Sequence, residues 1–538
     1  MKKFLLNLIL FCLLLSPLNS VLAQSPGAAG VDKINASAMK DYLYFIASDE
    51  MEGRDTPSKG LNMTAKFLAM NLSMWGLKPG GENGSYFQKI QIRRNKTDRV
   101  NSSVTFGGQN FKLGEDFFAF PNETDLTAPI VFASHGWVVK SKNINPYQNL
   151  DIKDKIVVIS NGFPQGLSYN DLTGNEGEDW FEPFDYIEKY GGKAVILIPS
   201  FESLASWDRT VSYFEEQGQT IFEKLEEKSF TLPVISPSPK LLIKLFSEES
   251  QSANNIFRDV SQTIAPFELK QDKKISLKIA VKTEKEVSQN VIAILEGSDP
   301  TLKNEYVAIG AHYDHVGVGS PVNGDKIYNG ADDDGSGTVA VLQLAEAFSH
   351  APSRPKRSIM FVWHCGEEKG LLGSRYLMKF PTVPLNQIIT QLNIDMIGRS
   401  KEPNDTKPAN KELSGPDEIY VIGSKLMSSE LGQVSESVNN SYLKLKFNYT
   451  YDDPNDPNRF FYRSDHYNYA RKGIPIIFYF NGVHEDYHKP SDSPDKIDYQ
   501  KMEKVTRTIY MTALDLANRA TRPVVDNPLP DAYSRGRD

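Results

Sequence analysis

The feature that most constrains this fold is a regular alternation of short apolar segments with segments of helical apolar spacing, from Gln289 onward. The apolar segments expected to be strands are 290–295, 306–310, 358–364, 388–394 and 475–480. The expected helices are 337–349, 373–379 and 499–519. Near-continuous apolar strands between amphipathic helices are typical of a mixed, largely parallel sheet covered by helices on both faces. We therefore predict an α/β fold.

Histidines and carboxylates lie where these strands end, and ligands of such sheets bind at the carboxyl ends of strands. Five segments carry them: Gly310-Ala-His-Tyr-Asp-His315, Asn329-Gly-Ala-Asp-Asp-Asp-Gly-Ser-Gly337, His364-Cys-Gly-Glu-Glu368, Asn393-Ile-Asp395 and Asp486-Tyr-His488. Nitrogen and hard oxygen donors suit Zn²⁺, and a shared carboxylate can hold two such ions about 3.5–4 Å apart. The set predicts a two-zinc hydrolase.

The first two segments leave some choices open. His312 follows an expected strand, and Asp314 is close enough in sequence to fix its second ring nitrogen. His315 is a rival for the ligand role. The Asp332–Asp334 triplet places three anions side by side, which is costly in a buried site without a cation. A calcium loop is a competing interpretation of the triplet, but the EF-hand spacing is absent.

The remaining segments supply further ligands and a base. Glu367 and Glu368 follow a strand and precede a glycine-rich turn, so one can bind metal while the other takes a proton from water. Asp395 ends an apolar strand, and a charge in that position needs a partner. His488 follows the last expected strand, with His484 as its local competitor.

Length and composition predict an ordinary globular protein of at least two domains. The chain has 538 residues, of which 40% are apolar and 24% charged, and this excludes a largely disordered chain. The net charge is −8 and no run of Lys or Arg stands out. Nucleic acid is therefore not an expected partner.

The N-terminus has the pattern of a secretory signal peptide, residues 1–23. Lys2 and Lys3 precede the apolar stretch 4–15, and Val21-Leu-Ala23 is a small-residue cleavage site. We expect an exported protein, periplasmic or secreted, with no stable membrane anchor after cleavage. Cys365 would then be the only cysteine left, so no internal disulfide forms, and a buried position suits it better than a nucleophilic one.

The rest of the chain divides into segments that differ in the spacing of their apolar residues. Helical spacing over 38–47 and 62–75 begins the segment 24–126. Brief apolar runs at 129–133, 155–159, 193–198 and 232–235, with a helix at 240–246, predict a small β-rich insert domain over 127–262. The catalytic domain is then expected over 263–522, and a C-terminal tail over 523–538.

In this order, the five segments resemble the co-catalytic di-zinc aminopeptidase family, which also includes glutamate carboxypeptidases and the catalytically silent transferrin receptor. The resemblance covers roughly 289–519, together with the Glu52-Gly-Arg54 to Gln88 region. The insert resembles a protease-associated domain. The family implies a zinc-exopeptidase-like fold, with peptides that have a free N-terminus as substrates.

The resemblance also implies roles for single residues. His312 and Asp395 would bind one zinc ion, and Glu368 and His488 a second. Asp333 would bridge the two ions. Glu367 would be the general base and then the general acid, Asp314 would orient His312, and Tyr487 would help to hold the oxyanion. The Asp333–Asp334 peptide bond would be cis.

Several alternatives remain open at this stage. Within the family, a carboxypeptidase, a dipeptidase and a glutaminyl-cyclase-like transferase with one working zinc are possible, and so is a binding protein that has lost catalysis. A calcium-stabilised adhesin would explain the acidic loops but not the histidines. Arg463, Ser464, Asp465 and His466 belong to an aromatic-rich stretch that is a candidate pocket wall. The sequence does not determine the oligomeric state.

Overall fold

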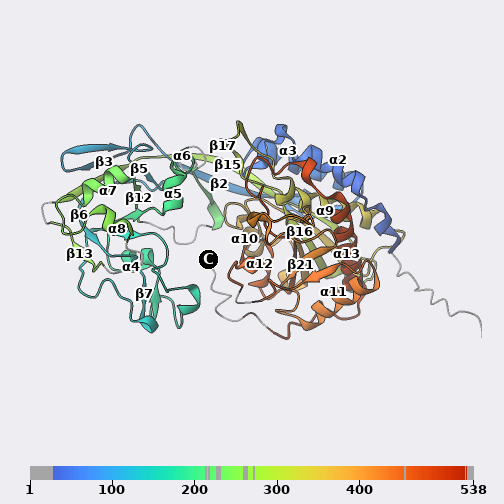
Figure 1. Cartoon of the computed structure of the whole chain (residues 1–538). Helices are drawn as coiled ribbons and strands as arrows, with labels where there is room; N and C mark the ends of the chain where they lie inside the picture. The colour runs from blue at the N-terminus through green and yellow to red at the C-terminus, as the bar shows by residue number, and fades with distance from the viewer. Residues whose placement is uncertain are drawn as a thin grey trace, which may run out of the picture.

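The computed structural model shows two lobes side by side (Figure 1). The structure describes residues 28–527 and 529, apart from 213–214, 216–217, 226–231, 259–263, 271–272 and 454–455. The expected signal peptide, 1–23, lies outside the described residues, as does most of the expected tail. Within the described part of the chain, every helix is too short or too polar to cross a membrane.

The larger lobe is built on a ten-stranded mixed sheet. Its order is β11-β2-β15-β19-β16-β20-β23-β21-β22, and β1 pairs with β15 off this path. The strands are β1 (Lys78–Pro79), β2 (Phe87–Thr97), β11 (Gln219–Phe222), β15 (Val281–Leu295), β16 (Tyr306–His312), β19 (Ser358–His364), β20 (Ile388–Ile394), β21 (Glu418–Ile422), β22 (Lys446–Asn448) and β23 (Ile476–Phe480). β19, β16, β20 and β23 form a continuous parallel set, and antiparallel neighbours flank it on both sides.

Helices cover both faces of this sheet, as predicted. Alternate side chains of one strand explain why: Val307 and Ile309 pack into one buried cluster, whereas Ala308 belongs to another. The first cluster includes side chains of α2 (Ala36–Ile46), α3 (Lys59–Met74), α9 (Gly337–Ser349), α11 (Ser429–Ser441) and α13 (Tyr499–Asn518). The second includes side chains of α10 (Leu372–Lys379) and α12 (His466–Ala470).

The expected elements with long apolar runs have nearly the bounds found in the structure. β19, β20 and α9 agree at both ends, and β16 continues two residues beyond the prediction to His312. The strand expected at 290–295 is the end of a longer β15. Its first part, from Val281 to Glu286, is polar and exposed or half-buried, so its sequence carries no apolar pattern. Cys365 is buried and unpaired, as expected.

The smaller lobe has a nine-stranded sheet of its own. The order is β4-β3-β14-β6-β8-β10-β12-β5, with β13 paired to β6. The strands are β3 (Ser103–Phe106), β4 (Gln109–Lys112), β5 (Phe117–Ala119), β6 (Thr124–Phe132), β8 (Ile156–Ser160), β10 (Ala194–Ile198), β12 (Val234–Pro237), β13 (Phe267–Glu268) and β14 (Lys274–Ile279). They extend beyond the expected 127–262 on both sides, with β3, β4 and β5 before it and β13 and β14 after it.

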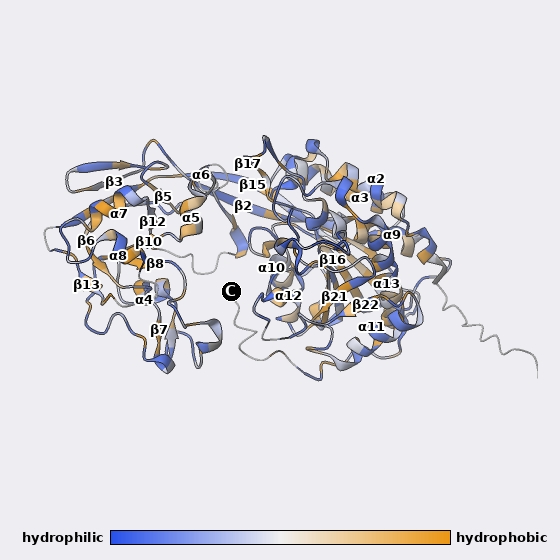
Figure 2. Cartoon of the chain, in the orientation of Figure 1, coloured by the Kyte–Doolittle hydropathy of each residue, from blue (hydrophilic) through white to orange (hydrophobic). Residues whose placement is uncertain are grey.

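Each lobe has its own apolar core. In the smaller lobe, two buried clusters lie around the central parallel strands and take in α7 (Pro239–Leu245) and α8 (Ala253–Arg258). Figure 2 shows hydrophobic residues gathered inside each lobe, while β2 and β15 are largely hydrophilic where they connect the lobes. The long β2–β15 pair is a polar bridge between two separate cores.

Candidate metal centre

Strand register brings the candidate ligands to one edge of the larger sheet. His312 is the last residue of β16 and pairs in register with His364, the last residue of β19. Asp395 follows the end of β20, which is parallel to β16. The carboxyl ends of these central strands therefore lie at the same level, where the sequence predicted the site.

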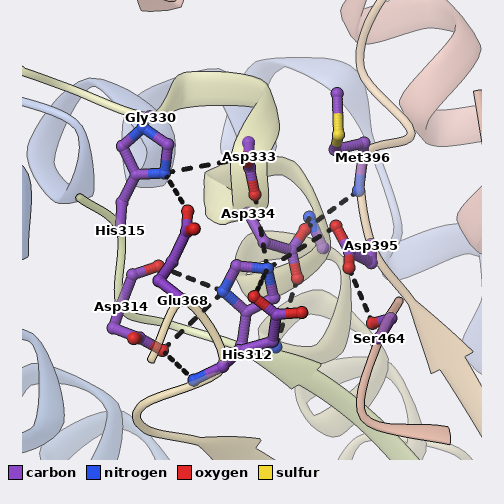
Figure 3. A network of polar contacts seen from close by, with 12 residues as sticks. His312, Asp314, His315, Gly330, Asp333, Asp334, Glu368, Asp395, Met396 and Ser464 are labelled. Atoms are coloured by element: carbon purple, nitrogen blue, oxygen red, sulfur yellow. Dashed lines mark hydrogen bonds and ion pairs between the residues drawn. The ribbon is translucent and has the colours of Figure 1, made fainter. Parts of the chain in front are cut away.

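The Asp332–Asp334 triplet avoids repulsion because its three side chains have different partners. Asp332 lies 3.2 Å from His484 Nε2 and accepts a hydrogen bond from a backbone N–H. Asp334 accepts hydrogen bonds from the backbone N–H groups of His312, Gly337 and Met396. Asp333 points toward the other candidate ligands (Figure 3). The Asp333–Asp334 peptide bond is cis, as the family resemblance implied.

The five residues predicted as metal ligands lie together around Asp333. His312 Nε2 is 3.3 Å from Asp333 Oδ1 and 3.6 Å from Asp395 Oδ1. On the other side, His488 Nε2 is 3.1 Å from Asp333 Oδ2 and 3.2 Å from Glu368 Oε2. The two oxygens of one carboxylate thus face two different groups of donors, which is the arrangement that a bridging ligand needs.

The structure adds His315 to the second group. Its Nδ1 lies 2.8 Å from Glu368 Oε1 and 3.7 Å from Asp333 Oδ2. One set of potential metal donors is His315, Asp333, Glu368 and His488, and another is His312, Asp334 and Asp395. Because the oxygens of Asp334 already accept three backbone N–H groups, Asp333 is the better candidate for the ligand shared by both sets.

The donor set fits a bound cation. Asp333 Oδ2, Glu368 Oε1, His488 Nε2 and both ring nitrogens of His315 are buried without a hydrogen bond among the described residues. These atoms nevertheless lie within 4 Å of other polar atoms of the cluster. Buried polar groups are normally hydrogen-bonded, so donors that converge without bonding one another indicate a ligand between them. Imidazole and carboxylate together suit zinc.

The charges of the cluster agree with that conclusion. Burial alone would raise the pKa of Asp333, but contacts with His312 and His488 hold it well below its usual range. Burial would lower the pKa of His488, but Glu368 and Asp333 raise it to about 10. A histidine whose proton is held this tightly marks a place where carboxylates favour positive charge.

Glu367 and Tyr487 lie beside the donors and line the same cavity. The candidate ligands Asp333 and Asp395 also line it, together with Arg463 and an apolar wall of Met396, Phe460, Phe478, Phe480 and Val483. Burial raises the pKa of Glu367 well above its ordinary value, against the attraction of His312. Arg463 donates a hydrogen bond to the Tyr487 hydroxyl at 3.5 Å.

Asp314 holds the site in a different way from the one expected. His312 Nδ1 is 3.1 Å from the backbone oxygen of Asp314 and 3.8 Å from its carboxylate. The backbone carbonyl is therefore the closer partner of the ring. The carboxylate instead accepts a hydrogen bond from the backbone N–H of Glu367 at 3.2 Å. Burial raises the pKa of Asp314 to about 7.

The candidate pocket stretch is divided between the pocket wall and its support. Arg463 lines the cavity, as does Phe460 at the start of the stretch. Ser464 donates to Asp395 Oδ2 at 2.6 Å, and so orients a ligand. His466 lies away from the donors, with Nε2 2.8 Å from the backbone oxygen of Phe461. Burial lowers the pKa of His466 to about 3, so this ring is neutral.

Arg54 is the supporting residue that the sequence did not reveal. Its fully buried guanidinium donates to the backbone oxygens of Tyr313, Ile46, Asn329 and Gly330. These bonds tie the loop after His312 to the loop before Asp333. The signal in the sequence was a charged residue in a short Glu-Gly-Arg turn between two amphipathic helices, but its partners are backbone atoms distant in sequence.

Comparison with known proteins agrees with this fold. Residues 290–513 match the family model of Peptidase family M28. Aminopeptidase YwaD of Bacillus subtilis is 25% identical over 444 residues, which are 81% of this chain and 77% of that protein. Leucine aminopeptidase 2 of Arthroderma otae is 28% identical over 264 residues, 44% of this chain and 47% of the relative. The chain thus spans about half the length of that relative.

Two solved structures have the same overall fold. The aminopeptidase from Aneurinibacillus sp. strain AM-1 superposes with a TM-score of 0.57 at 17% identity, over 93% of this chain and 98% of that chain. BSAP, a zinc aminopeptidase from Bacillus subtilis, has a TM-score of 0.52 at 18% identity, over 93% of this chain and 99% of its own. Both superpositions include the two lobes, since they cover nearly the whole chain.

Proposed function

We propose that this protein is a zinc-dependent aminopeptidase that holds two zinc ions bridged by Asp333. The observation that carries the proposal is the placement of Asp333 between two groups of unsatisfied nitrogen and oxygen donors. The site lies within the segment that matches the model of Peptidase family M28. The names of the aminopeptidases similar to this chain give further support.

In the proposed centre, each ion takes ligands from one side of Asp333. His312 and Asp395 would hold one ion, and Glu368 and His488 would hold the other. His315 Nδ1 lies 2.8 Å from Glu368 Oε1. When bound, zinc acidifies water toward neutral pH and polarises a carbonyl group. The positions of the protein's own side chains then determine the reaction.

Glu367 is the proposed general base and general acid. It lies in the cavity next to Asp333 and Asp395, where its carboxylate can accept a proton and return it. It takes the proton from the attacking water and gives it to the departing amine nitrogen. The Tyr487 hydroxyl, on the same cavity wall, donates a hydrogen bond to the substrate oxygen as negative charge develops there.

The cavity favours substrates that begin with an apolar residue. Carboxylates of its lining attract a free α-amine, whereas Phe460, Phe478 and Phe480 provide an apolar surface for the first side chain. A carboxypeptidase would instead need a cation for the terminal carboxylate, and Arg463 is the cation in this cavity. Mass spectrometry of the cleaved peptide distinguishes aminopeptidase from carboxypeptidase activity.

The test is mass spectrometry of a leucine-led peptide incubated with the protein, with a free or an acetylated N-terminus, with or without a zinc chelator. We expect stepwise loss of residues from the free N-terminus only, abolished by the chelator and restored by zinc. Loss of residues from the C-terminus of both peptides would instead establish a carboxypeptidase. If neither peptide changed while two zinc ions were bound per chain, the proposed activity would be wrong.

Metal analysis tests the bridging role separately. Asp333→Asn removes the carboxylate shared by both groups of donors, so we expect it to lose both ions. Asp151→Asn, on the exposed surface of the smaller lobe, is the matched control and should keep both. Two zinc ions retained by Asp333→Asn would contradict the bridging role.

We further infer that the protein is exported and that its smaller lobe is a protease-associated domain. The pattern of residues 1–23 supports export. Intact-mass measurement of material from cell fractions should find a chain that begins at Gln24 outside the cytoplasm, and a full-length cytoplasmic chain would refute export.

The separate sheet and core of the smaller lobe support an independent domain. A fragment of residues 98–280 should then melt cooperatively by circular dichroism, and a gradual melt would refute independence.

A further inference from the structure

One short segment, within the part of the sequence that builds the smaller lobe, belongs to the larger sheet. Residues 219–225, here called the docked segment, consist of β11 and the 3₁₀ helix η7 (Glu223–Leu225). β11 is the edge strand of the larger sheet, with Gln219 opposite Asn95 and Phe222 opposite Ile92. The chain therefore returns from the smaller lobe to the catalytic one between β10 and β12.

The docked segment places apolar side chains in the core of the larger lobe. Phe222 is 1% exposed and Leu225 is 4% exposed, and both belong to the buried cluster around the larger sheet. The Phe222 ring contacts the ring of Tyr376 edge to face, at 6.4 Å between centroids. Burying a phenylalanine contributes about 1.5–3 kcal/mol, so the segment is firmly held.

The Phe222 ring also lies against the turn that carries the proposed catalytic base. Gly366 has a φ of +71°, and a Cβ atom at this position would lie only 3.0 Å from Cζ of Phe222. Gly366 immediately precedes Glu367 and Glu368, which are the proposed base and a proposed metal ligand. The ring of a distant segment is thus in close contact with the backbone that positions both side chains.

Hydrogen bonds hold the other sides of this turn. The backbone N–H of Gly366 donates to the Thr56 hydroxyl at 3.0 Å, and that of Glu367 donates to the Asp314 carboxylate at 3.2 Å. The backbone N–H of Leu372 donates to the backbone oxygen of Gly366 at 2.9 Å and so fixes the carbonyl side of the turn. The Phe222 ring is the apolar support that complements these polar contacts.

We propose that Phe222 is a positioning residue for Glu367, and that through it the smaller-lobe sequence sets the geometry of the catalytic turn. This inference rests on the proposed function for its kinetic consequence, but not for its structural one. Removing the ring leaves a cavity beside Gly366, and the surroundings relax only partly into such a cavity. The turn then samples orientations in which Glu367 is misplaced relative to the attacking water. Small misplacements of catalytic groups are costly.

Kinetics and hydrogen exchange of the full-length zinc-loaded protein test this proposal together. For Phe222→Ala we expect kcat for the leucine-led peptide to fall about 10-fold with KM within about twofold. Hydrogen exchange of the peptide that spans residues 364–373 should become faster. Phe222→Leu should restore most of kcat, because a branched side chain refills much of the space. Ile221→Ala, one residue earlier on the same strand and thus on its opposite face, is the matched control and should change neither readout.

Three other results would overturn the proposal. The first is unchanged kcat and unchanged exchange in Phe222→Ala. The second is an equal fall of kcat in Ile221→Ala, which would show that general weakening of the edge strand is responsible. The third is faster exchange throughout the larger lobe in Phe222→Ala, which would indicate a merely structural role. If the wild type cleaved no peptide, the proposed function would fail, while hydrogen exchange would still decide whether Phe222 holds the turn.

Discussion

The two lobes share a structural plan but differ at the carboxyl ends of their parallel strands. In the larger lobe, β16 and β19 end in His312 and His364, and Asp395 follows β20. In the smaller lobe, β6, β8, β10 and β12 also run parallel. They are followed by Ala133, Asn161, Pro199 and Ser238. Parallel strands therefore create a suitable edge in both lobes, but only one edge carries a cluster of donors among the described residues.

The difference shows that a buried site needs partners for its charged side chains as well as a suitable edge of parallel strands. Burying a carboxylate costs several kcal/mol unless it is paired. The larger lobe therefore surrounds its donors with partners, such as His484 for Asp332 and Ser464 for Asp395. In the smaller lobe, an ion pair such as Lys155–Glu268 lies near the surface and its buried clusters are apolar. Its sheet can be stable without a cation.

The largest expected effect is a loss of turnover, and it should follow from a change in the larger lobe only. Glu367→Gln removes the proposed proton acceptor without changing the side-chain volume, so we expect kcat to fall about 10²–10⁴-fold. Both zinc ions should remain bound, by metal analysis. Glu178→Gln, on the exposed surface of the smaller lobe, should retain wild-type kcat. Undiminished turnover of the zinc-loaded Glu367 variant would remove this residue from the mechanism.

The second effect compares a histidine near the end of a parallel strand in each lobe. His135 lies just beyond the end of β6, with Nδ1 3.2 Å from the backbone oxygen of Gly162, whereas His312 ends β16 among carboxylates. His312→Asn should reduce the zinc content from two ions to one, because it removes a ligand of one ion only. His135→Asn should keep two. Loss of zinc from the His135 variant would mean that the smaller lobe also binds metal.

Sequence patterns predicted best where a single local rule determines the structure. β19, β20 and α9 were predicted with their bounds because each is a long apolar run or a continuous amphipathic helix. The five ligand candidates were proposed as histidines and carboxylates of five short segments, and the structure places their side chains around Asp333. The polar half of β15 was missed because pairing with β2 stabilises it instead of apolar burial.

What the sequence could not supply depends on contacts between distant segments. His312 and His315 are equally suitable as metal ligands by sequence alone. The fold shows that His312 faces Asp395 and His315 faces Glu368. The role of Arg54 arises from four backbone carbonyls. The docked segment 219–225 joins a sheet whose neighbouring strand is more than a hundred residues away. No local pattern encodes such pairings.

A third, smaller effect tests whether the two cores are independent. Ile196 in β10 and Ile309 in β16 are both fully buried on parallel strands. Either one replaced by Ala should destabilise its own lobe by about 2–5 kcal/mol. Ile309→Ala should also weaken zinc binding, because His312 lies three residues further along the same strand, whereas Ile196→Ala should not. Calorimetry together with zinc titration measures both quantities. Equal loss of zinc affinity in the two variants would show that the cores are coupled.

The smallest effect concerns a buried cation of the larger lobe. Lys501 is almost fully buried and donates to the backbone oxygen of Arg399 and to the hydroxyl of Ser414, each at 2.8 Å. Burial lowers its pKa to about 8 from the ordinary value of 10.5. Between these two values the unfolded chain binds more protons than the folded one, so this residue makes stability rise with pH. Below pH 8 the charged amine carries its full desolvation cost.

Lys501→Met should therefore remove this pH dependence of the free energy of unfolding, as well as change its value. Urea unfolding at pH 7.5 and at pH 9.5 gives the free energy of unfolding of each protein. We expect the wild type to gain about 2 kcal/mol relative to the variant over this interval, since one pKa unit corresponds to about 1.4 kcal/mol. Hydrogen bonds lost in the variant are the same at both pH values and cancel in the difference. A difference that stayed constant with pH would mean that Lys501 keeps its ordinary pKa. The larger lobe would then hold this charge without cost, and the contrast between its charged interior and the apolar one of the smaller lobe would be confined to the metal centre.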